Sequence, residues 1–241
     1  MRICSAGALL AVFLCLLASS AAFAQESTYA KDGFYVGGSL TYGGLSGDFD
    51  GNHVLTDSGG ILLTQQYLLL PDFKNSTGFG LIFGYRRGWY AGEITYQQSR
   101  PDWSMRSSVG SLSTTGTATL AFLNFNYKVY FNQLSRLQPY AFIGPSVCFL
   151  TIDDGSTDDD GHVGDGRLTG FGGNVGVGLA YYINDRICLS GDVSYRDVFF
   201  DSYEGVAGSG HLPGGYTDGS ESDSRIFGSG LACAISITYT F

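Results

Sequence analysis

The fold is decided by the stretch Leu231–Ala232–Cys233–Ala234–Ile235–Ser236–Ile237–Thr238–Tyr239–Thr240–Phe241, in which large apolar residues alternate with small or polar ones. Its odd positions carry Leu, Cys, Ile, Ile, Tyr and Phe, and its even positions carry Ala, Ser and Thr. A period of two places successive side chains on opposite faces of an extended strand. The stretch is therefore predicted to be a β-strand with one apolar face and an integral element of the fold.

The same alternation recurs upstream and predicts seven further strands. With the last stretch, the predicted strands are 34–42, 78–85, 90–97, 114–131, 140–152, 171–182, 187–196 and 231–241. Alternation is poor from Thr114 to Phe122. In 140–152, the Gly144–Pro145 pair suggests a bulge at which the inner and outer faces could exchange, so the faces of that strand are left unassigned.

The connections between these strands alternate between long and short. Long segments are expected at about 43–76, 98–114, 153–167 and 201–224, and short ones at 86–88, 132–138 and 183–186. This alternation predicts an all-β fold, an eight-stranded antiparallel up-and-down transmembrane β-barrel with four long extracellular loops. An even number of strands closes the sheet without an exposed edge, and both termini fall at the short-turn end.

The first residues have the order of a secretory signal peptide. Arg2 precedes an apolar run that ends at Leu17, and Ala22–Phe23–Ala24 supplies the small residues of a cleavage site. Residues 1–24 are therefore predicted to be a signal peptide, with export through the general secretory pathway and a mature domain at 25–241. A membrane anchor is the alternative, but the apolar run falls short of the ~20 residues that a spanning helix needs.

The composition favours a membrane barrel over a water-soluble domain. The 241 residues include 36 Gly, aromatic residues reach 15%, and charged residues are only 15% of the chain, against about a quarter in ordinary domains. Three cysteines follow the signal peptide, namely Cys148, Cys188 and Cys233. An odd number without CxxC spacing predicts small packing residues instead of a disulfide framework.

Four charged residues within the predicted strands determine which face meets lipid. Glu93, Lys128, Asp192 and Arg196 share the face that carries the small and polar residues. A basic residue facing hydrocarbon costs roughly 2–4 kcal/mol near the midplane, so these side chains are expected in the lumen. They have two interpretations: a charge network that neutralises itself inside a filled barrel, which we favour, or the lining of a narrow ion path.

This assignment of faces places aromatic side chains outside, near both ends of the strands. At the short-turn end the predicted girdle comprises Phe34, Tyr85, Tyr90, Tyr127, Phe131 and Tyr181, together with Tyr239 and Phe241; toward the other end it comprises Tyr42, Phe79, Tyr96, Phe171 and Tyr195. Aromatic rings at both interfaces are typical of membrane barrels. A soluble ligand-binding barrel is the rival, and it requires a polar outer face and an apolar lumen.

Three stretches resemble the eight-stranded outer-membrane barrels of Gram-negative bacteria, the group of the outer-membrane protein A transmembrane domain, outer-membrane protein X and the opacity-type surface antigens. They are Gly33–Phe34–Tyr35–Val36–Gly37–Gly38, Asn174–Val175–Gly176–Val177–Gly178–Leu179–Ala180–Tyr181–Tyr182 and Ile235–Ser236–Ile237–Thr238–Tyr239–Thr240–Phe241. The resemblance implies an outer-membrane location among lipid and lipopolysaccharide. It also implies that Ile237, Tyr239 and Phe241 form the signal read by the barrel-assembly machinery. No peptidoglycan-binding domain follows the barrel, so a cell-wall tether role is not expected.

The predicted loops contain two unusual stretches. Asp154, Asp158, Asp159, Asp160 and Asp165 lie within 153–165, where they could hold a divalent cation or form a merely solvated charge run, which we favour. Residues 61–70 are rich in Ile and Leu. Their side chains are expected to pack together in a small hairpin, and an exposed patch that binds a partner or lipid is the alternative.

Catalysis has little support in the sequence. His53, His162 and His211 all fall in predicted loops, and only His162 stands beside acidic residues. The predicted function is that of a non-enzymatic outer-membrane surface protein for envelope structure, surface display, adhesion or host contact through its loops. A narrow porin-like channel is the alternative, and a lipid-modifying or proteolytic barrel is disfavoured. No cofactor, metal or nucleic acid is implied, and the chain is expected to be a monomer.

Overall fold

The computed structural model describes residues 29–47, 49, 71–106, 113–152, 155–156, 162–163, 166–205 and 226–241. Eight long strands span most of these residues: β1 (Gly33–Gly43), β4 (Ser76–Arg87), β5 (Tyr90–Ser99), β7 (Ser113–Tyr130), β8 (Leu137–Ile152), β11 (Gly166–Tyr182), β12 (Ile187–Gly205) and β13 (Ile226–Thr240). Five short strands accompany them: β2 (Ser46–Gly47), β3 (Asp72–Phe73), β6 (Asp102–Arg106), β9 (Gly155–Ser156) and β10 (His162–Val163). No helix in the described part of the chain has the length and apolar character needed to cross a membrane.

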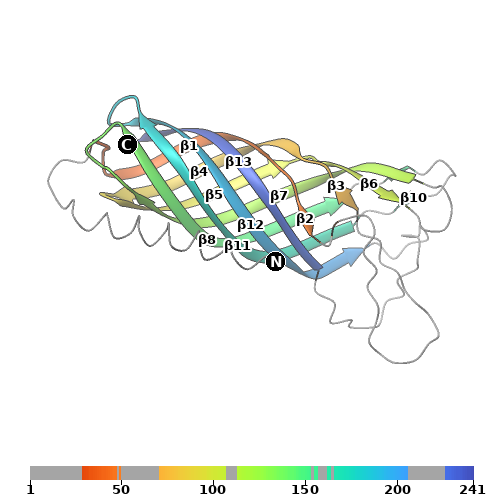
Figure 1. Cartoon of the computed structure of the whole chain (residues 1–241). Coiled ribbons are helices and arrows are strands. Elements are labelled where there is room, and N and C mark those ends of the chain that lie inside the picture. Colours follow the sequence, from red (N-terminus) through yellow and green to blue (C-terminus); the bar gives the residue numbers. More distant parts are fainter. Residues whose placement is uncertain are drawn as a thin grey trace, which may run out of the picture.

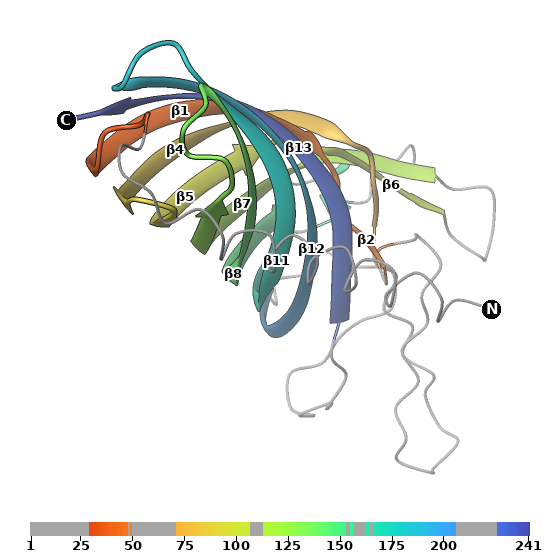
Figure 2. The same ribbon diagram turned by 60° about the vertical axis from the view of Figure 1, so that its left-hand side comes forward.

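The eight long strands form one closed ring. Each pairs antiparallel with its neighbours in the order β1, β4, β5, β7, β8, β11, β12 and β13, and β13 pairs back with β1 from Tyr35↔Thr240 to Gly43↔Ala232. The strands run obliquely around the interior (Figures 1 and 2). The predicted eight-stranded antiparallel up-and-down barrel is therefore confirmed.

The two ends of the barrel differ in their connections. At one, the turn end, short turns occupy 88–89, 131–136 and 183–186. Gly88 is the first residue of a two-residue turn between the paired Arg87 and Tyr90, and its φ of 57° is one that favours glycine. The strand ends that the four longer connections join are at the other, the loop end, where the described short strands are also found (Figure 1).

The strands at the loop end extend farther than the sequence predicts. β12 continues to Gly205 and β7 begins at Ser113, while β6 lies inside the predicted loop 98–114 and pairs with both β3 and β7. The backbone ladder continues past the predicted alternation because its hydrogen bonds do not depend on which side chains the strand carries. The predicted loops 98–114 and 201–224 therefore begin or end within strands.

The suggested exchange of faces at Gly144–Pro145 is wrong. β8 keeps one register with β11 across this pair, from Ser146↔Gly172 to Ile143↔Val175. The even-numbered side chains of β8 face inward on both sides of the pair, at Gln138, Tyr140, Phe142, Ser146, Cys148 and Leu150. The structure has a register shift elsewhere, between Thr169 and Gly170 where β11 pairs with β12.

Large apolar side chains cover the outer face. Phe34, Tyr85, Tyr127 and Tyr181 are exposed near the turn end, as are Tyr42, Phe79, Phe171 and Tyr195 toward the loop end. Tyr90 and Tyr96 are half-buried, and Phe131 follows the last residue of β7 and is also half-buried. The soluble-barrel alternative required a polar outer face, which this barrel lacks.

The close approach of β8 to β7 at Gly144 generates a stability prediction. A Cβ at this position would lie 1.9 Å from the Phe125 carbonyl oxygen, whereas a Cβ at Gly92 would meet nothing within 4 Å. Gly144→Ala is expected to lower the free energy of unfolding by about 1–3 kcal/mol or more. Gly92→Ala is the matched control and is expected to change it by no more than about 1 kcal/mol. Urea unfolding in lipid vesicles, followed by tryptophan fluorescence, measures both, and equal stabilities would contradict the assigned contact.

Candidate functional site

The lumen is the candidate site, because it brings together the charged side chains of strands far apart in the sequence. It consists of three layers. The turn-end layer is built around Arg86, the polar middle layer contains the predicted charges, and the loop-end layer is apolar. Alternate residues of every strand point into the lumen, so the inward residues of neighbouring strands at one level make up each layer.

Arg86 closes the turn-end layer. Its side chain is only 3% exposed, and Nη2 donates to Gln138 Oε1 at 2.7 Å while Nε donates to the Gly88 carbonyl oxygen at 2.9 Å. Nη1 donates to the hydroxyl of Tyr182. The guanidinium carbon also lies 4.0 Å from the centre of the Tyr130 ring. A planar cation with this many donors and a ring face beneath it is held in one position.

The chain before β1 crosses the same end of the barrel and contacts all three turns. Tyr29 N donates to the Gln133 carbonyl oxygen at 2.9 Å, and Lys31 N donates to the Asp185 carbonyl oxygen at 3.0 Å. The amide of Gly88 donates to Asp32 Oδ1 at 2.7 Å. Ala30, between these anchors, is only 1% exposed. Residues 29–32 therefore cover the mouth of the lumen at the turn end.

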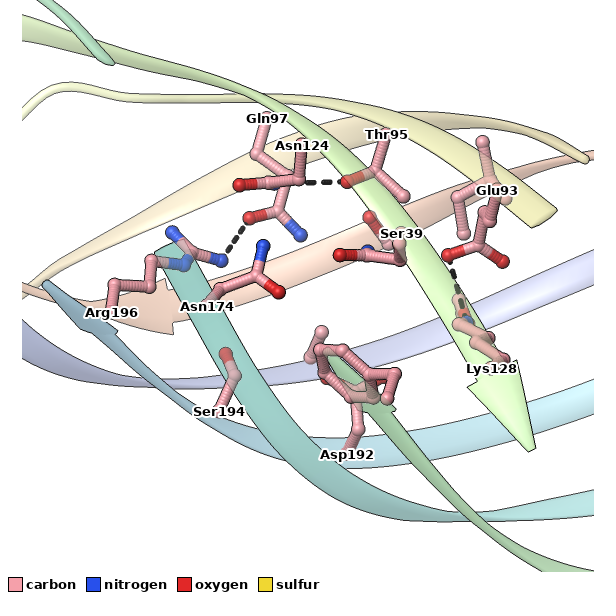
Figure 3. Close-up of a pocket in the computed structure, with 15 residues that line it drawn as sticks. Ser39, Glu93, Thr95, Gln97, Asn124, Lys128, Asn174, Asp192, Ser194 and Arg196 are labelled. Carbon is pink, nitrogen blue, oxygen red and sulfur yellow. Dashed lines mark hydrogen bonds and ion pairs between the residues drawn. The ribbon is translucent and has the colours of Figure 1, made fainter. Parts of the chain in front are cut away.

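In the middle layer, two carboxylates face two different partners; Figure 3 shows Glu93 next to Lys128, with Asp192 apart from them. Lys128 Nζ lies 2.8 Å from Glu93 Oε1, and Tyr35 donates its hydroxyl proton to Glu93 Oε2 at 2.9 Å. Asp192 instead accepts a hydrogen bond from the Tyr140 hydroxyl at 2.9 Å. Lys128 Nζ also lies 4.9 Å from the centre of the Tyr140 ring, which links the two groups.

The four predicted charges have different partners. Arg196 donates to Gln97 Oε1 and stacks 4.6 Å from the centre of the Phe122 ring, so its partners are an amide and an aromatic ring. Only Glu93 and Lys128 form an ion pair among the described lumen residues. The structure brings Glu93 and Lys128 together as an ion pair and gives Arg196 an amide partner, and all four charges line the same cavity, so a single charge network stays a prediction.

A chain of uncharged polar groups connects the strands beside these charges. Asn124 Nδ2 donates to Thr95 Oγ1 at 2.9 Å, and the Ser146 hydroxyl donates to Asn124 Oδ1 at 2.7 Å. Asn174 Nδ2 donates in turn to Ser146 Oγ at 3.0 Å. The chain spans β5, β7, β8 and β11, so it fixes side chains across half of the lumen.

The cavities left along the lumen are small. Volumes of about 30, 20 and 20 Å³ separate the described side chains in the middle, loop-side and turn-side parts. Such a volume admits one or two water molecules. Four buried atoms without a protein hydrogen-bond partner belong to residues that line the middle cavity: Ser39 Oγ, Asn126 Oδ1, Asn174 Oδ1 and Arg196 Nε. The middle layer is thus a filled polar interior with room for single waters.

The loop-end layer is an apolar core, which the alternation pattern does not predict. Its buried members are Leu45, Phe49, Phe73, Trp103, Ala118, Leu120, Phe122, Cys148, Leu150, Leu168, Val198, Phe200 and Ile226. Phe49 lies at its centre, with ring centroids 5.3 Å from Phe73 and 5.4 Å from Phe200. An apolar lumen was expected only of a soluble barrel, but here it is confined to the loop end.

The remaining predicted residues occupy separate places. Ile237, Tyr239 and Phe241 point outward at the end of the last strand. The rings of Tyr239 and Phe241 meet edge to face, with their centroids 5.4 Å apart. Cys148 and Cys188 are buried and Cys233 is exposed on the outer face, and none of the three forms a disulfide. The possible cation site lies outside the described residues, and its members are Asp154, Asp158, Asp159, Asp160 and Asp165. Also outside are the stretch 61–70, the predicted signal peptide 1–24, His53 and His211. Only the backbone of His162 is described. The described part of the chain contains no cluster of three metal-ligating side chains.

Two candidate functional residues were not predicted, although the alternation of inward and outward residues identifies both. Arg86 follows the outward Tyr85 and therefore points inward, but it was assigned to a turn. Asp197 follows Val193 and Tyr195 on the outward parity of β12 and is exposed on the wall. Extending the alternation two residues beyond each predicted strand would have found them.

The family model described as outer membrane protein beta-barrel domain matches residues 10–228 of this sequence. The chain belongs to this family. Its barrel is therefore a transmembrane one that sits in the lipid and lipopolysaccharide of the Gram-negative outer membrane, and the predicted resemblance to eight-stranded outer-membrane barrels is confirmed.

Solved structures agree with this fold. The chain is similar to outer membrane protein OprG from Pseudomonas aeruginosa, with 14% identity, a TM-score of 0.53, and coverage of 90% of this chain and 99% of that one. It is also similar to Neisserial surface protein A (NspA), with 14% identity, a TM-score of 0.50, and coverage of 87% and 98%. At this identity the likeness concerns the fold alone. None of the curated proteins matches the sequence.

The ion pair of the middle layer generates a second prediction. Lys128→Met leaves the Glu93 carboxylate buried without its cation and is expected to lower the free energy of unfolding by about 3–5 kcal/mol. The double variant Glu93→Gln with Lys128→Met removes both charges and is expected to recover much of that loss. Urea unfolding in lipid vesicles measures the cycle, with Lys74→Met, at an exposed lysine, as the control for lost charge. A double variant as unstable as the sum of the single ones would show that the pair does not act as a unit.

Proposed function

We propose that this outer-membrane barrel is a closed, non-enzymatic surface protein whose loop end faces the cell exterior and makes the functional contacts. The observation that carries the proposal is the filled lumen. Three successive layers, centred on Arg86, on the Glu93–Lys128 pair and on Phe49, occupy the interior from one end to the other. A barrel without a path through it acts through its surfaces.

Two features support the loops as the contacting part. The strands extend beyond the predicted lipid-facing segments at the loop end, and an apolar core packs between them there. The sequence of those connections is acidic, with a formal net charge of −9 for the whole chain. Acidic loops are suited to binding a cationic surface or host ligand, and residues 61–70 add an apolar stretch to the first loop sequence.

A narrow channel is the second candidate, favoured by the polar and charged side chains of the middle layer. Conduction needs a continuous hydrated path, and the cavities of about 20–30 Å³ are separated by buried side chains. The apolar layer at the loop end adds a stretch without polar groups, where an ion would lose its hydration shell. The geometry therefore supports closure over conduction. An enzyme is supported still less, because the described lumen holds no histidine or activated nucleophile.

A conductance experiment with a loop variant tests this function. The purified barrel in planar bilayers is expected to give no steady conductance, and cells that display it are expected to bind host cells or matrix. Replacing residues 51–70 with a short Gly-Ser linker is expected to abolish that binding and leave the bilayer trace unchanged. Circular dichroism and heat-modifiable mobility confirm that each preparation is folded. A steady conductance that disappears with Asp192→Asn would instead identify the lumen as an ion path.

We also propose that the last strand carries the signal for the barrel-assembly machinery. Ile237, Tyr239 and Phe241 form one outward row, and Phe241 N donates to the Phe34 carbonyl oxygen at 2.9 Å, so the chain end closes the barrel. Phe241→Ala keeps this backbone bond and is expected to reduce the amount of folded barrel in the outer membrane. Phe241→Tyr retains the aromatic ring and is expected to behave as the wild type. Membrane fractionation with heat-modifiable mobility measures both, and normal insertion of the alanine variant would refute the role.

A further inference from the structure

The outer wall holds a carboxylate within an otherwise apolar surface. Asp197 on β12 is exposed and points away from the lumen, and it has no hydrogen-bond or ion-pair partner among the described residues. Its cross-strand neighbours are Gly173 on β11 and Ser229 on β13. A carboxylate on the lipid side of a membrane barrel is uncommon enough to be a functional candidate.

Aromatic and aliphatic rows border this position on both sides. Toward the loop end, Phe171, Phe199 and Phe227 form one cross-strand row on β11, β12 and β13. Toward the turn end, Val175, Tyr195 and Leu231 form another, and all six side chains are exposed. The three strands lie side by side in the wall (Figure 1). The carboxylate therefore lies between two apolar rows, at the level of the aromatic girdle predicted for the loop end, and such girdles sit where membrane meets water.

A groove of about 370 Å³ is lined by Asp197, the three phenylalanines, Gly172 and Gly173. Small-molecule sites occupy roughly 300–1,000 Å³, so the groove suits a head group with a short part of a tail. Gly173 forms an open floor, because a Cβ there would meet only the Gly144 carbonyl oxygen, at 3.5 Å. The absence of a side chain at Gly173 is what leaves the space beside Asp197 accessible.

The lining defines the chemistry of the occupant. A single carboxylate attracts a cation, but a hard metal ion requires several oxygen ligands, which the groove lacks. The faces of aromatic rings attract ammonium groups, and quaternary ammonium is the usual guest of aromatic cages. The row of Val175, Tyr195 and Leu231 continues the apolar surface toward the turn end, where an alkyl chain would lie against the wall.

We propose that the groove at Asp197 binds a membrane-borne cationic amphiphile, an alkyl chain with an ammonium head group. The head group lies between Asp197 and the rings of Phe171, Phe199 and Phe227, and the chain follows the wall into the membrane. The net charge of −9 enriches cations near the protein and assists their arrival. This site is on the opposite side of the wall from the lumen and does not depend on whether the barrel conducts.

The test uses the whole barrel in phosphatidylcholine nanodiscs with an alkyltrimethylammonium probe that carries a nitroxide beside its head group. Amide NMR signals of Gly172 and Gly173 report how often the nitroxide is near the groove, and the amide of Gln98, on the opposite wall, reports the lipid background. The probe is expected to be enriched about three- to tenfold at the groove, as a carboxylate and ring faces together allow. A probe of the same length with a sulfonate head group is expected to show no enrichment.

Three variants separate charge from shape. Asp197→Asn keeps the shape and is expected to reduce the enrichment to background, and Gly173→Leu keeps the charge, fills the groove and is expected to do the same. Asp185→Asn removes an exposed carboxylate at the turn end and is expected to have no effect. Equal broadening at Gly173 and Gln98, or enrichment that survives Asp197→Asn, would overturn the proposal. The wild type could instead self-associate without enriching the amphiphile, and Asp197→Asn could remove that association. This result would show that a second copy of the chain occupies the groove, and it would also overturn the proposal.

Discussion

The backbone ladder between β1 and β13 is the interaction on which the rest of the barrel depends. Each backbone N–H or C=O left without a partner in lipid costs several kcal/mol, so the first and last strands must pair. The ladder from Tyr35↔Thr240 to Gly43↔Ala232 achieves this, and Phe241 N extends it to Phe34. Closure also fixes the register of every strand. A slip by one residue would exchange the two faces and move Glu93, Lys128 and Asp192 into lipid.

A ring of eight strands leaves an interior that side chains fill, and the composition of that filling changes with height. Where the outer face is apolar, the lumen holds the ion pair and the polar chain through Asn124, because the outward residues already supply the hydrophobic surface that the membrane requires. Toward the loop end, Phe49, Phe122 and Phe200 form an apolar core inside instead, although Phe149 and Phe199 still expose apolar rings on the outer face at this level. The lumen thus has a polar filling at one level and an apolar core at another.

Alternation predicted the strands, the closure and the two faces, because in lipid the period of two is enforced on every strand. It failed where that constraint ends: Thr114 to Phe122 alternates poorly because this half of β7 lines the apolar core. The partners of Arg196 were not predictable, since contacts across the lumen depend on the stagger of strands that are distant in sequence. The exchange of faces suggested at Gly144–Pro145 is wrong for a local reason. A proline can signal a bulge, yet here the ladder resumes on both sides without a shift.

The alternation along β12 that points Asp192 into the lumen points Asp197 outward, and the environment of each carboxylate depends on its position along the barrel axis. Asp192 lies within the barrel and is held by Tyr140, whereas Asp197 lies on the outer wall at the level of the predicted loop-end girdle. The cost of a charged side chain on the lipid face falls to about 0–1 kcal/mol near the interface, so this position is tolerable without a protein partner. The rings of Phe171 and Phe199 line the same groove as the carboxylate. A cation that is itself partly apolar can satisfy both the charge and the rings, which neither water nor a hydrated metal ion does.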